Sequence, residues 1–502
     1  MTGFSEYEGY DALGLAELVR RGEVSATDLV EEAIARVERV NPKLNAVVTS
    51  MYVQARAMAQ EPLGDGVFAG VPFVLKDLIL AVPGVPTQSG SRYYRGWKPA
   101  VATELYRRQR KAGLIPICKT NTPEFGLMPV TEPAAFGPTS TPWKIGRTSG
   151  GSSGGSAALV AARAVPMGHG GDGGGSIRIP ASCCGLFGMK PTRGRTPSGP
   201  GASEHWNGFA IEHAVTLSVR DSAALLDATR GFERGAAYAV EAPGRPLLEE
   251  VGAQPGKLRI ACHTEPAMPG SVHADCIDAV ERSIELLEEL GHQVENVSPE
   301  HKPMDLAQHF LTVVCANTAI DVEEAQALVG RPAQYDDFEP ETWLLALIGG
   351  AMSAADLERS VRALQTESRR LAVLYADYDV VLTPTLGKPP LPHGALRATG
   401  AEAVVQKLAA RAKLGRLIEK SGALEQAARR AYDFIPFTPV ANFTGQPSMN
   451  VPLHWNDEGL PIGSMFTSRF GDEAVLFRLA AQLEEAMPWR NRRPPVISTP
   501  TP

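Results

Sequence analysis

The chain has 502 residues, enough to bury a large core, and its 44% hydrophobic and 21% charged residues are typical of a globular protein. A net charge of −7 offers no attraction to nucleic-acid phosphates or anionic membranes. Six cysteines without a C-x-x-C pair argue against a disulfide framework and a structural zinc site, and we expect the adjacent Cys183 and Cys184 to be small buried residues.

The N-terminal stretch "MTGFSEYEGYDALGL" is acidic and lacks the basic and apolar regions of a signal peptide. No uncharged apolar run reaches the 18 or so residues that a membrane span needs. We therefore expect a cytoplasmic protein.

Helices and strands are predicted to alternate through the first third of the chain. Residues 11–40 have the apolar spacing of two helices, and Ser25 with Asp28 forms a capping-box pattern at the start of the second. "FAGVPFVLKDLIL" (68–80) is typical of a buried strand, and residues 103–120 predict a helix followed by a short strand. This alternation indicates an α/β fold.

The rest of the chain continues the pattern with one change of composition. Residues 156–165 are helical in character and lead into a glycine run, and residues 214–300 alternate again. Residues 301–436 are helix-rich and poor in glycine, which indicates an insertion that covers the site and shapes it for substrate. We expect one domain over residues 1–492 and a disordered tail at 493–502. Three returning strands and a closing helix are predicted at 379–386, 448–453, 461–470 and 473–487.

We expect two glycine–serine loops, "GGSSGGS" (150–156) and "GGDGGGS" (170–176), and these carry the functional signal. Neither contains the Gly-Lys-Ser/Thr of a phosphate-binding loop. Residues 150–154 match the G-x-S-x-G of Ser-His-Asp hydrolases, but no strand leads into them. The "HGGD" at 169–172 follows that serine, whereas in those enzymes it precedes it, and we expect His169 to be structural.

A serine hydrolase with a lysine base is the third interpretation. It requires a nucleophile, a neutral lysine and backbone donors for an oxyanion. Ser176 provides the nucleophile, and the N–H groups of Gly173, Gly174 and Gly175 provide the donors. Lys76 lies between apolar residues, where burial would lower its pKa, although a lone lysine in such a stretch is more often at the surface.

Several segments, in family order over nearly the whole chain, resemble the amidase signature family. These segments are "GVPFVLKD", "CKTNTPEFG", "GGSSGGSAALVAA", "GGSIRIPASCCGLFGMKPTRGR" and "PIGSMF…GDEAVLFRLAAQLE". The resemblance implies a single α/β/α domain whose twisted mixed β-sheet is covered by helices on both faces. It is weakest between about residues 230 and 435.

The resemblance also implies the catalytic roles. Lys76 would be the base, Ser176 the nucleophile, and Ser152 a bridging serine after a cis peptide bond that relays the proton. The glycine N–H groups at 173–175 would then line an oxyanion hole, and Ser153, Asp172 and Arg178 match positions that support the triad. No metal or cofactor is implied.

One departure from the family pattern bears on the site. Many members have G-T-D-T-G-G-S, whereas this chain has Gly173 in place of the second threonine. The missing side chain predicts more room beside the oxyanion hole. With "TNTPEFG" and "HGGD" it resembles the branch that includes the cyclic-dimer (nylon-oligomer) hydrolases.

The implied activity is hydrolysis of an amide through an acyl-enzyme, with a small, fairly apolar amide, a carbamate or a cyclic or linear oligoamide as substrate. An amidotransferase subunit that supplies ammonia, and a non-catalytic scaffold of the same fold, are the alternatives. We expect no nucleic-acid or membrane partner, and a homodimer is a reasonable expectation for the family.

Overall fold

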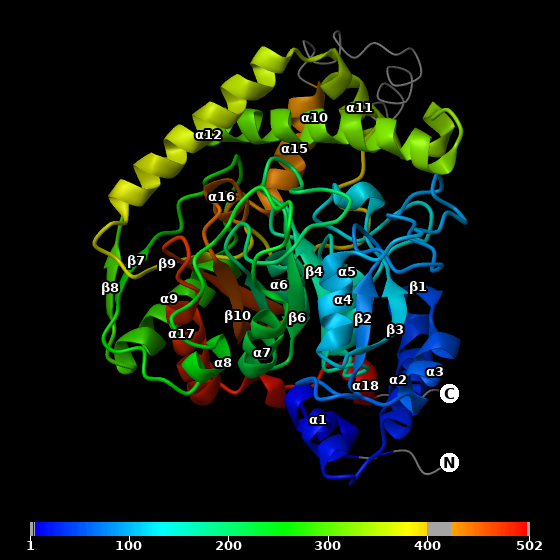
Figure 1. Ribbon diagram of the computed structural model, residues 1–502. Coiled ribbons are helices and arrows are strands. Elements are labelled where there is room, and N and C mark those ends of the chain that lie inside the picture. The colour runs from blue at the N-terminus through cyan, green and yellow to red at the C-terminus, as the bar shows by residue number, and fades with distance from the viewer. Residues whose placement is uncertain (1–3, 5, 399–422, 499–502) are drawn as a thin grey trace.

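One mixed β-sheet runs through the molecule in the computed structural model, which describes residues 4, 6–398 and 423–498 (Figure 1). The strand order is β1-β3-β2-β4-β6-β5-β10-β11-β9-β7-β8. Parallel pairing joins β2 to β3 and β4, and β7 to β8 and β9, while the other pairs are antiparallel. The strands are β1 (Val47–Ser50), β2 (Pro72–Lys76), β3 (Ile115–Thr120), β4 (Met167–Asp172), β5 (Phe187–Lys190), β6 (Ile211–Thr216), β7 (Arg259–Cys262), β8 (Gln293–Asn296), β9 (Val380–Pro384), β10 (Ser448–Trp455) and β11 (Pro461–Ser468).

Helices surround this sheet and cap one end of it. They are α1 (Ala12–Arg20), α2 (Ala26–Leu44), α3 (Tyr52–Gln60), α4 (Glu104–Lys111), α5 (Gly154–Ala161), α6 (Arg178–Cys184), α7 (Val219–Thr229), α8 (Leu247–Glu250), α9 (Ala274–Glu289), α10 (Pro303–Val329), α11 (Pro340–Ala351), α12 (Ala354–Leu374), α15 (Ala423–Phe434), α16 (Pro439–Thr444), α17 (Glu473–Ala486) and α18 (Pro495–Ser498). Over the described part of the chain, no helix combines the length and apolar character needed to cross a membrane.

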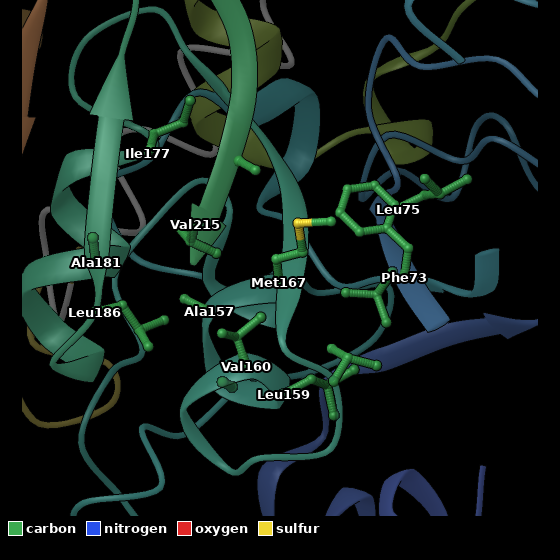
Figure 2. Packing of buried hydrophobic residues seen from close by; sticks show 14 of the residues in the cluster. Phe73, Leu75, Ala157, Leu159, Val160, Met167, Ile177, Ala181, Leu186 and Val215 are labelled. Atoms are coloured by element: carbon green, nitrogen blue, oxygen red, sulfur yellow. The ribbon is translucent and has the colours of Figure 1, made fainter. Parts of the chain in front are cut away.

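Two large apolar clusters form the core. The first joins β2, β3 and β4 to α2, α5 and α6, and Figure 2 shows Phe73, Leu75 and Met167 close to the α5 side chains Leu159 and Val160. The second joins β5, β7, β9, β10 and β11 to α7, α9 and α17. The predicted α/β architecture, a mixed sheet covered by helices, is therefore confirmed.

Most predicted elements are present. The two N-terminal helices are α1 and α2, and Ser25 and Asp28 form the predicted capping box. The predicted strand within 68–80 is β2, and residues 103–120 contain α4 followed by β3. The returning strands at 379–386, 448–453 and 461–470 contain β9, β10 and β11, and the closing helix is α17.

The glycine run is where the local prediction was wrong. We expected residues 170–172 to lie in a loop. They belong instead to strand β4 (167–172), which lies between β2 and β6. Glycine and aspartate are depleted in strands, so composition does not predict one here. The pairing with β6, which runs from Met167 to Asp172, supplies the backbone hydrogen bonds that hold these residues extended.

The helix-rich region 301–436 contains α10, α11, α12 and, within it, strand β9. The first three helices lie together above one end of the sheet (Figure 1). Residues 399–422 of this region and residues 499–502 of the predicted tail lie outside the described residues. Within the described part of that tail, Pro495–Ser498 forms α18.

Candidate active site

The candidate residues come together where parallel strands end. Lys76 is the last residue of β2 and Asp172 the last of β4, and parallel neighbours place their carboxyl ends at the same edge of the sheet. Ser152 and Ser153 lie just before α5, and Ser176 lies between β4 and α6. The fold thus gathers residues that are up to 100 positions apart in the sequence.

Lys76 is buried, with 2% of its surface exposed. Its Nζ donates to Ser152 Oγ at 2.7 Å and to the Gly171 carbonyl at 3.2 Å. Burial lowers the pKa of Lys76 to about 7, against the opposing effect of the Glu212 and Asp172 carboxylates. A substantial fraction of this lysine is therefore neutral near neutral pH, and a neutral amine next to a hydroxyl can accept its proton.

The three serines occupy different positions around that amine. The Gly151–Ser152 peptide bond is cis. The Ser153 backbone N–H and Oγ donate to the Ser176 carbonyl at 3.2 and 2.5 Å, which fixes the backbone of the nucleophile candidate. The hydroxyls of Ser152 and Ser176 make no hydrogen bond with each other or with any described histidine. A proton relay between them thus requires the two hydroxyls to come within hydrogen-bond distance.

Asp172 and Arg178 form a buried ion pair beside the nucleophile candidate. Arg178 Nη2 and Nε lie 2.9 and 3.0 Å from the two carboxylate oxygens, and neither side chain is exposed. Burial by itself raises the pKa of Asp172, but the Arg178 guanidinium outweighs it and holds the pKa well below its usual range. The same carboxylate accepts the backbone N–H groups of Gly175 at 2.8 Å and Ile177 at 3.1 Å, so the pair determines the shape of the loop.

The Gly175 contact corrects the predicted set of oxyanion donors. Its N–H points at Asp172 and is not free to bind an oxyanion. Within the described structure, the N–H groups of Gly173, Gly174 and Ser176 have no acceptor. The N–H groups available for an oxyanion are therefore those of residues 173, 174 and 176, because the Asp172 carboxylate accepts the N–H of Gly175.

Three side chains that the sequence analysis missed pack against the same loop. A Cβ at Gly173 would lie 3.1 Å from the Trp206 ring, one at Gly174 would lie 3.5 Å from Phe310, and one at Gly175 would lie 2.4 Å from Thr438 Oγ1. The extra room predicted beside Gly173 is therefore filled by the Trp206 indole. These residues come from three separate segments, and no motif marks them.

Asn442 was also missed. Its amide Nδ2 donates to the Asp172 carbonyl and carboxylate at 2.9 and 2.8 Å, and its Oδ1 accepts from Arg178 at 2.7 Å. It lies in α16 and is the first residue of the "NFTGQP" stretch. Thr438 directly precedes this helix. Asn442 thus contacts both partners of the ion pair.

A cavity of about 710 Å³ lies between α10, α11 and the start of α12. Its described lining includes Asn207, Asn317, Trp343 and Leu357 but not Lys76, Ser152 or Ser176. The candidate active site is defined instead by the contacts around its glycines.

His169, expected to be structural, is buried on β4 with its Nε2 3.2 Å from Glu212 Oε1 on β6. Burial lowers its pKa. A neutral, fully enclosed imidazole that meets a carboxylate rather than a serine does not fit a Ser-His-Asp arrangement.

Comparison with known proteins gives a consistent result. The sequence profile of the family described as "Amidase" matches residues 28–477. The 6-aminohexanoate-cyclic-dimer hydrolase of Pseudomonas sp. (strain NK87) is 36% identical over 496 residues, which cover 97% of each chain. That of Paenarthrobacter ureafaciens is 35% identical over 495 residues, again 97% of each. The solved structure of a 6-aminohexanoate cyclic dimer hydrolase complexed with substrate superposes with a TM-score of 0.87 at 34% identity, over 98% of this chain and 99% of that one.

Proposed function

Since this chain belongs to the amidase signature family and is an amidohydrolase, we propose that it cleaves its amide through an acyl-enzyme on Ser176, with Lys76 as the base and Ser152 as the proton relay. The observation that carries this proposal is the 2.7 Å contact between Lys76 Nζ and Ser152 Oγ in a buried site. A buried lysine that touches a hydroxyl has the protonation state and the reach of a general base.

In the first half-reaction Ser176 Oγ forms a bond to the amide carbonyl carbon. Its proton passes to Ser152 Oγ while the Ser152 proton passes to Lys76 Nζ. The free N–H groups of Gly173, Gly174 and Ser176 stabilise the resulting oxyanion. The C–N bond then breaks, and the proton returns along the same path to the leaving amine.

In the second half-reaction water takes the place of the amine. The relay removes a proton from water as its oxygen bonds to the acyl carbon, and the Ser176 ester bond breaks. The carboxylic acid leaves, and Ser176 regains its proton. Asp172 and Arg178 take no proton in this scheme and keep the loop in shape.

For the substrate, we propose an uncharged cyclic or linear oligoamide. Two relatives that match this chain over almost their full length are named 6-aminohexanoate-cyclic-dimer hydrolases, and these names support this class. The loop surroundings support it as well, because the Trp206 and Phe310 rings next to Gly173 and Gly174 offer apolar contact rather than charge.

A hydrolysis screen on the purified protein tests the proposal. The panel contains a short aliphatic amide, an aryl amide, a carbamate and the 6-aminohexanoate cyclic dimer, with S176A run in parallel. We expect turnover of the cyclic dimer that is absent in S176A. Turnover that survives in S176A would overturn the mechanism, and turnover of the other amides alone would overturn the substrate class.

A further inference from the structure

Behind Lys76 lies a cluster of buried ionisable side chains that the mechanism above does not use. The groups that face Lys76 or its neighbours are Asp77 after β2, Lys119 on β3, His169 and Asp172 on β4, His205 before β6, and Glu212 and His213 on β6. Burying so many charges is costly unless each has a partner. Lys76 therefore needs a carboxylate that no other cation holds.

Two of the three carboxylates are already engaged. Asp172 is held by Arg178 and by backbone N–H groups. Asp77 lies 3.7 Å from Lys119, whose Nζ also donates to the Leu80 carbonyl at 2.7 Å. Glu212 therefore remains as the carboxylate without a cationic partner.

The register of β4 and β6 brings Glu212 near the lysine, without a direct ion pair between the two side chains. Glu212 is paired with Gly171, the residue whose carbonyl accepts from Lys76. A Cβ at Gly171 would lie 3.8 Å from both Glu212 Oε1 and Lys76 Nζ. Both charged groups therefore lie next to Gly171, which has no side chain between them. Glu212 is 6% exposed, and its Oε1 makes no hydrogen bond with a described residue.

His169 lies beside this carboxylate. It stands two residues before Gly171 on β4, so its side chain and that of Glu212 point to the same face of the sheet. Its Nε2 lies 3.2 Å from Glu212 Oε1. The imidazole is fully buried, and burial lowers its pKa, so it is a neutral neighbour rather than a competing cation.

The need for a counter-charge arises during catalysis. When Lys76 takes up the serine proton it becomes a buried ammonium ion with three N–H donors. Two have acceptors, Ser152 Oγ and the Gly171 carbonyl, and the third has none among the described residues. A negative charge near this ion favours the protonated form, as in other buried base–carboxylate pairs.

We propose that Glu212, supported by His169, is a positioning residue that provides the counter-charge for the Lys76 ammonium ion formed during catalysis. This role rests on the proposed function of Lys76 as the base. No atom is transferred to Glu212, which acts through Lys76 and touches no substrate.

The test uses covalent labelling of Ser176 by a fluorophosphonate, because it needs no knowledge of the substrate. The second-order rate constant is measured from about pH 5 to about pH 9 for the wild type, E212Q and E473Q. Glu473 is a matched control, since it is also a buried carboxylate but its ion-pair partner is Arg195.

We expect the rate of the wild type to fall on the acid side as Lys76 becomes protonated. Removing the negative charge in E212Q makes the ammonium ion less stable, so the acid limb moves to lower pH by about one unit and the plateau rate falls about tenfold. E473Q keeps the wild-type limb. An E212Q limb that coincides with those of the wild type and E473Q overturns the proposal, even if the plateau is lower.

If E212Q does not fold, the conservative variants E212D and E473D test the role of Glu212 instead. E212D retains the charge one methylene further away, and we expect its limb to move in the same direction but by less, while E473D shows no movement. An unmoved E212D limb overturns the proposal. K76M separates the two levels of inference: labelling at the wild-type rate rejects Lys76 as the base, whereas lost labelling with an unmoved E212Q limb rejects only the role of Glu212.

Discussion

Lys76 and Lys190 are two buried lysines in equivalent places. Each is the last residue of a strand, β2 and β5, and each is at most 2% exposed. Burial lowers the pKa of both to about 7. They differ in what the amine touches, because Lys76 Nζ reaches the Ser152 hydroxyl, whereas Lys190 Nζ donates to the Pro191 carbonyl at 2.9 Å.

This difference shows what distinguishes a base from a structural lysine. A lowered pKa makes the amine available in its neutral form, but it does not provide a proton to accept. A carbonyl oxygen has none, whereas a hydroxyl has one and can pass it on. The surroundings of Lys190 are also more cationic, since Arg178 and Arg193 help to lower its pKa.

Replacing each lysine by methionine tests most directly whether the two differ in function. We expect K76M to lower kcat/KM by about 10⁴-fold, because the residues of a relay act as a unit. K190M keeps the shape of its site and should lower kcat/KM by less than about tenfold. Steady-state kinetics on one amide substrate measures both, and comparable losses in the two variants would contradict the distinction.

The neighbouring Ser152 and Ser153 test which hydroxyl relays the proton to Lys76. S152A removes the hydroxyl that touches Lys76, and we expect a loss of about 10²- to 10⁴-fold in kcat. S153A removes a hydroxyl that bonds to the Ser176 and Gly171 carbonyls, and its loss should be smaller and accompanied by a lower unfolding temperature. Kinetics and thermal unfolding on the same samples separate the two effects. A larger loss in S153A than in S152A would mean that the relay serine is Ser153 and not Ser152.

The pH dependence of activity should follow Lys76 alone. As pH falls through about 7, Lys76 gains its proton and stops acting as a base, so kcat/KM should fall about tenfold per pH unit. K190M should keep this acid limb, although Lys190 titrates in the same range. A pH–rate profile of the two proteins checks this, and a limb that shifts in K190M would assign the titration to the other lysine.

Stability against pH is the smallest expected effect and includes both lysines. Between about pH 7 and about pH 10 the folded state keeps Lys190 neutral while the unfolded chain protonates it, so the unfolded state binds more protons. Stability attributable to Lys190 therefore rises with pH, by about 1 kcal/mol per pH unit. Denaturant unfolding at several pH values should show a smaller rise in K190M than in the wild type; equal slopes would mean that Lys190 is charged in the folded protein.

Much of the fold follows from local signals. The capping box at Ser25, the apolar spacing of the helices and the branched residues of the β2 segment specify their elements through nearby residues alone. The motif resemblance specifies Lys76, Ser152 and Ser176 as candidates in the same way, and their catalytic roles stay predictions. The structure adds that Lys76 and Ser152 are in hydrogen-bond contact.

Other features depend on segments that meet only when the chain folds. The extended conformation at 167–172 results from pairing with β6, and the glycines there carry no strand preference. The loss of the Gly175 N–H as a donor follows from the position of the Asp172 side chain three residues earlier, which motif spacing does not report. Trp206, Phe310 and Thr438 surround the loop from distant parts of the sequence.

The family, the α/β class and the residue types that the chemistry needs are therefore encoded in short contiguous patterns of the sequence. The folded structure was needed to show that Lys76, and not the equally buried Lys190, faces a hydroxyl, which N–H groups remain free and where Glu212 lies relative to Lys76. The physical reason is that burial, strand register and contacts between distant segments set hydrogen bonds and pKa values, and a linear pattern contains none of them.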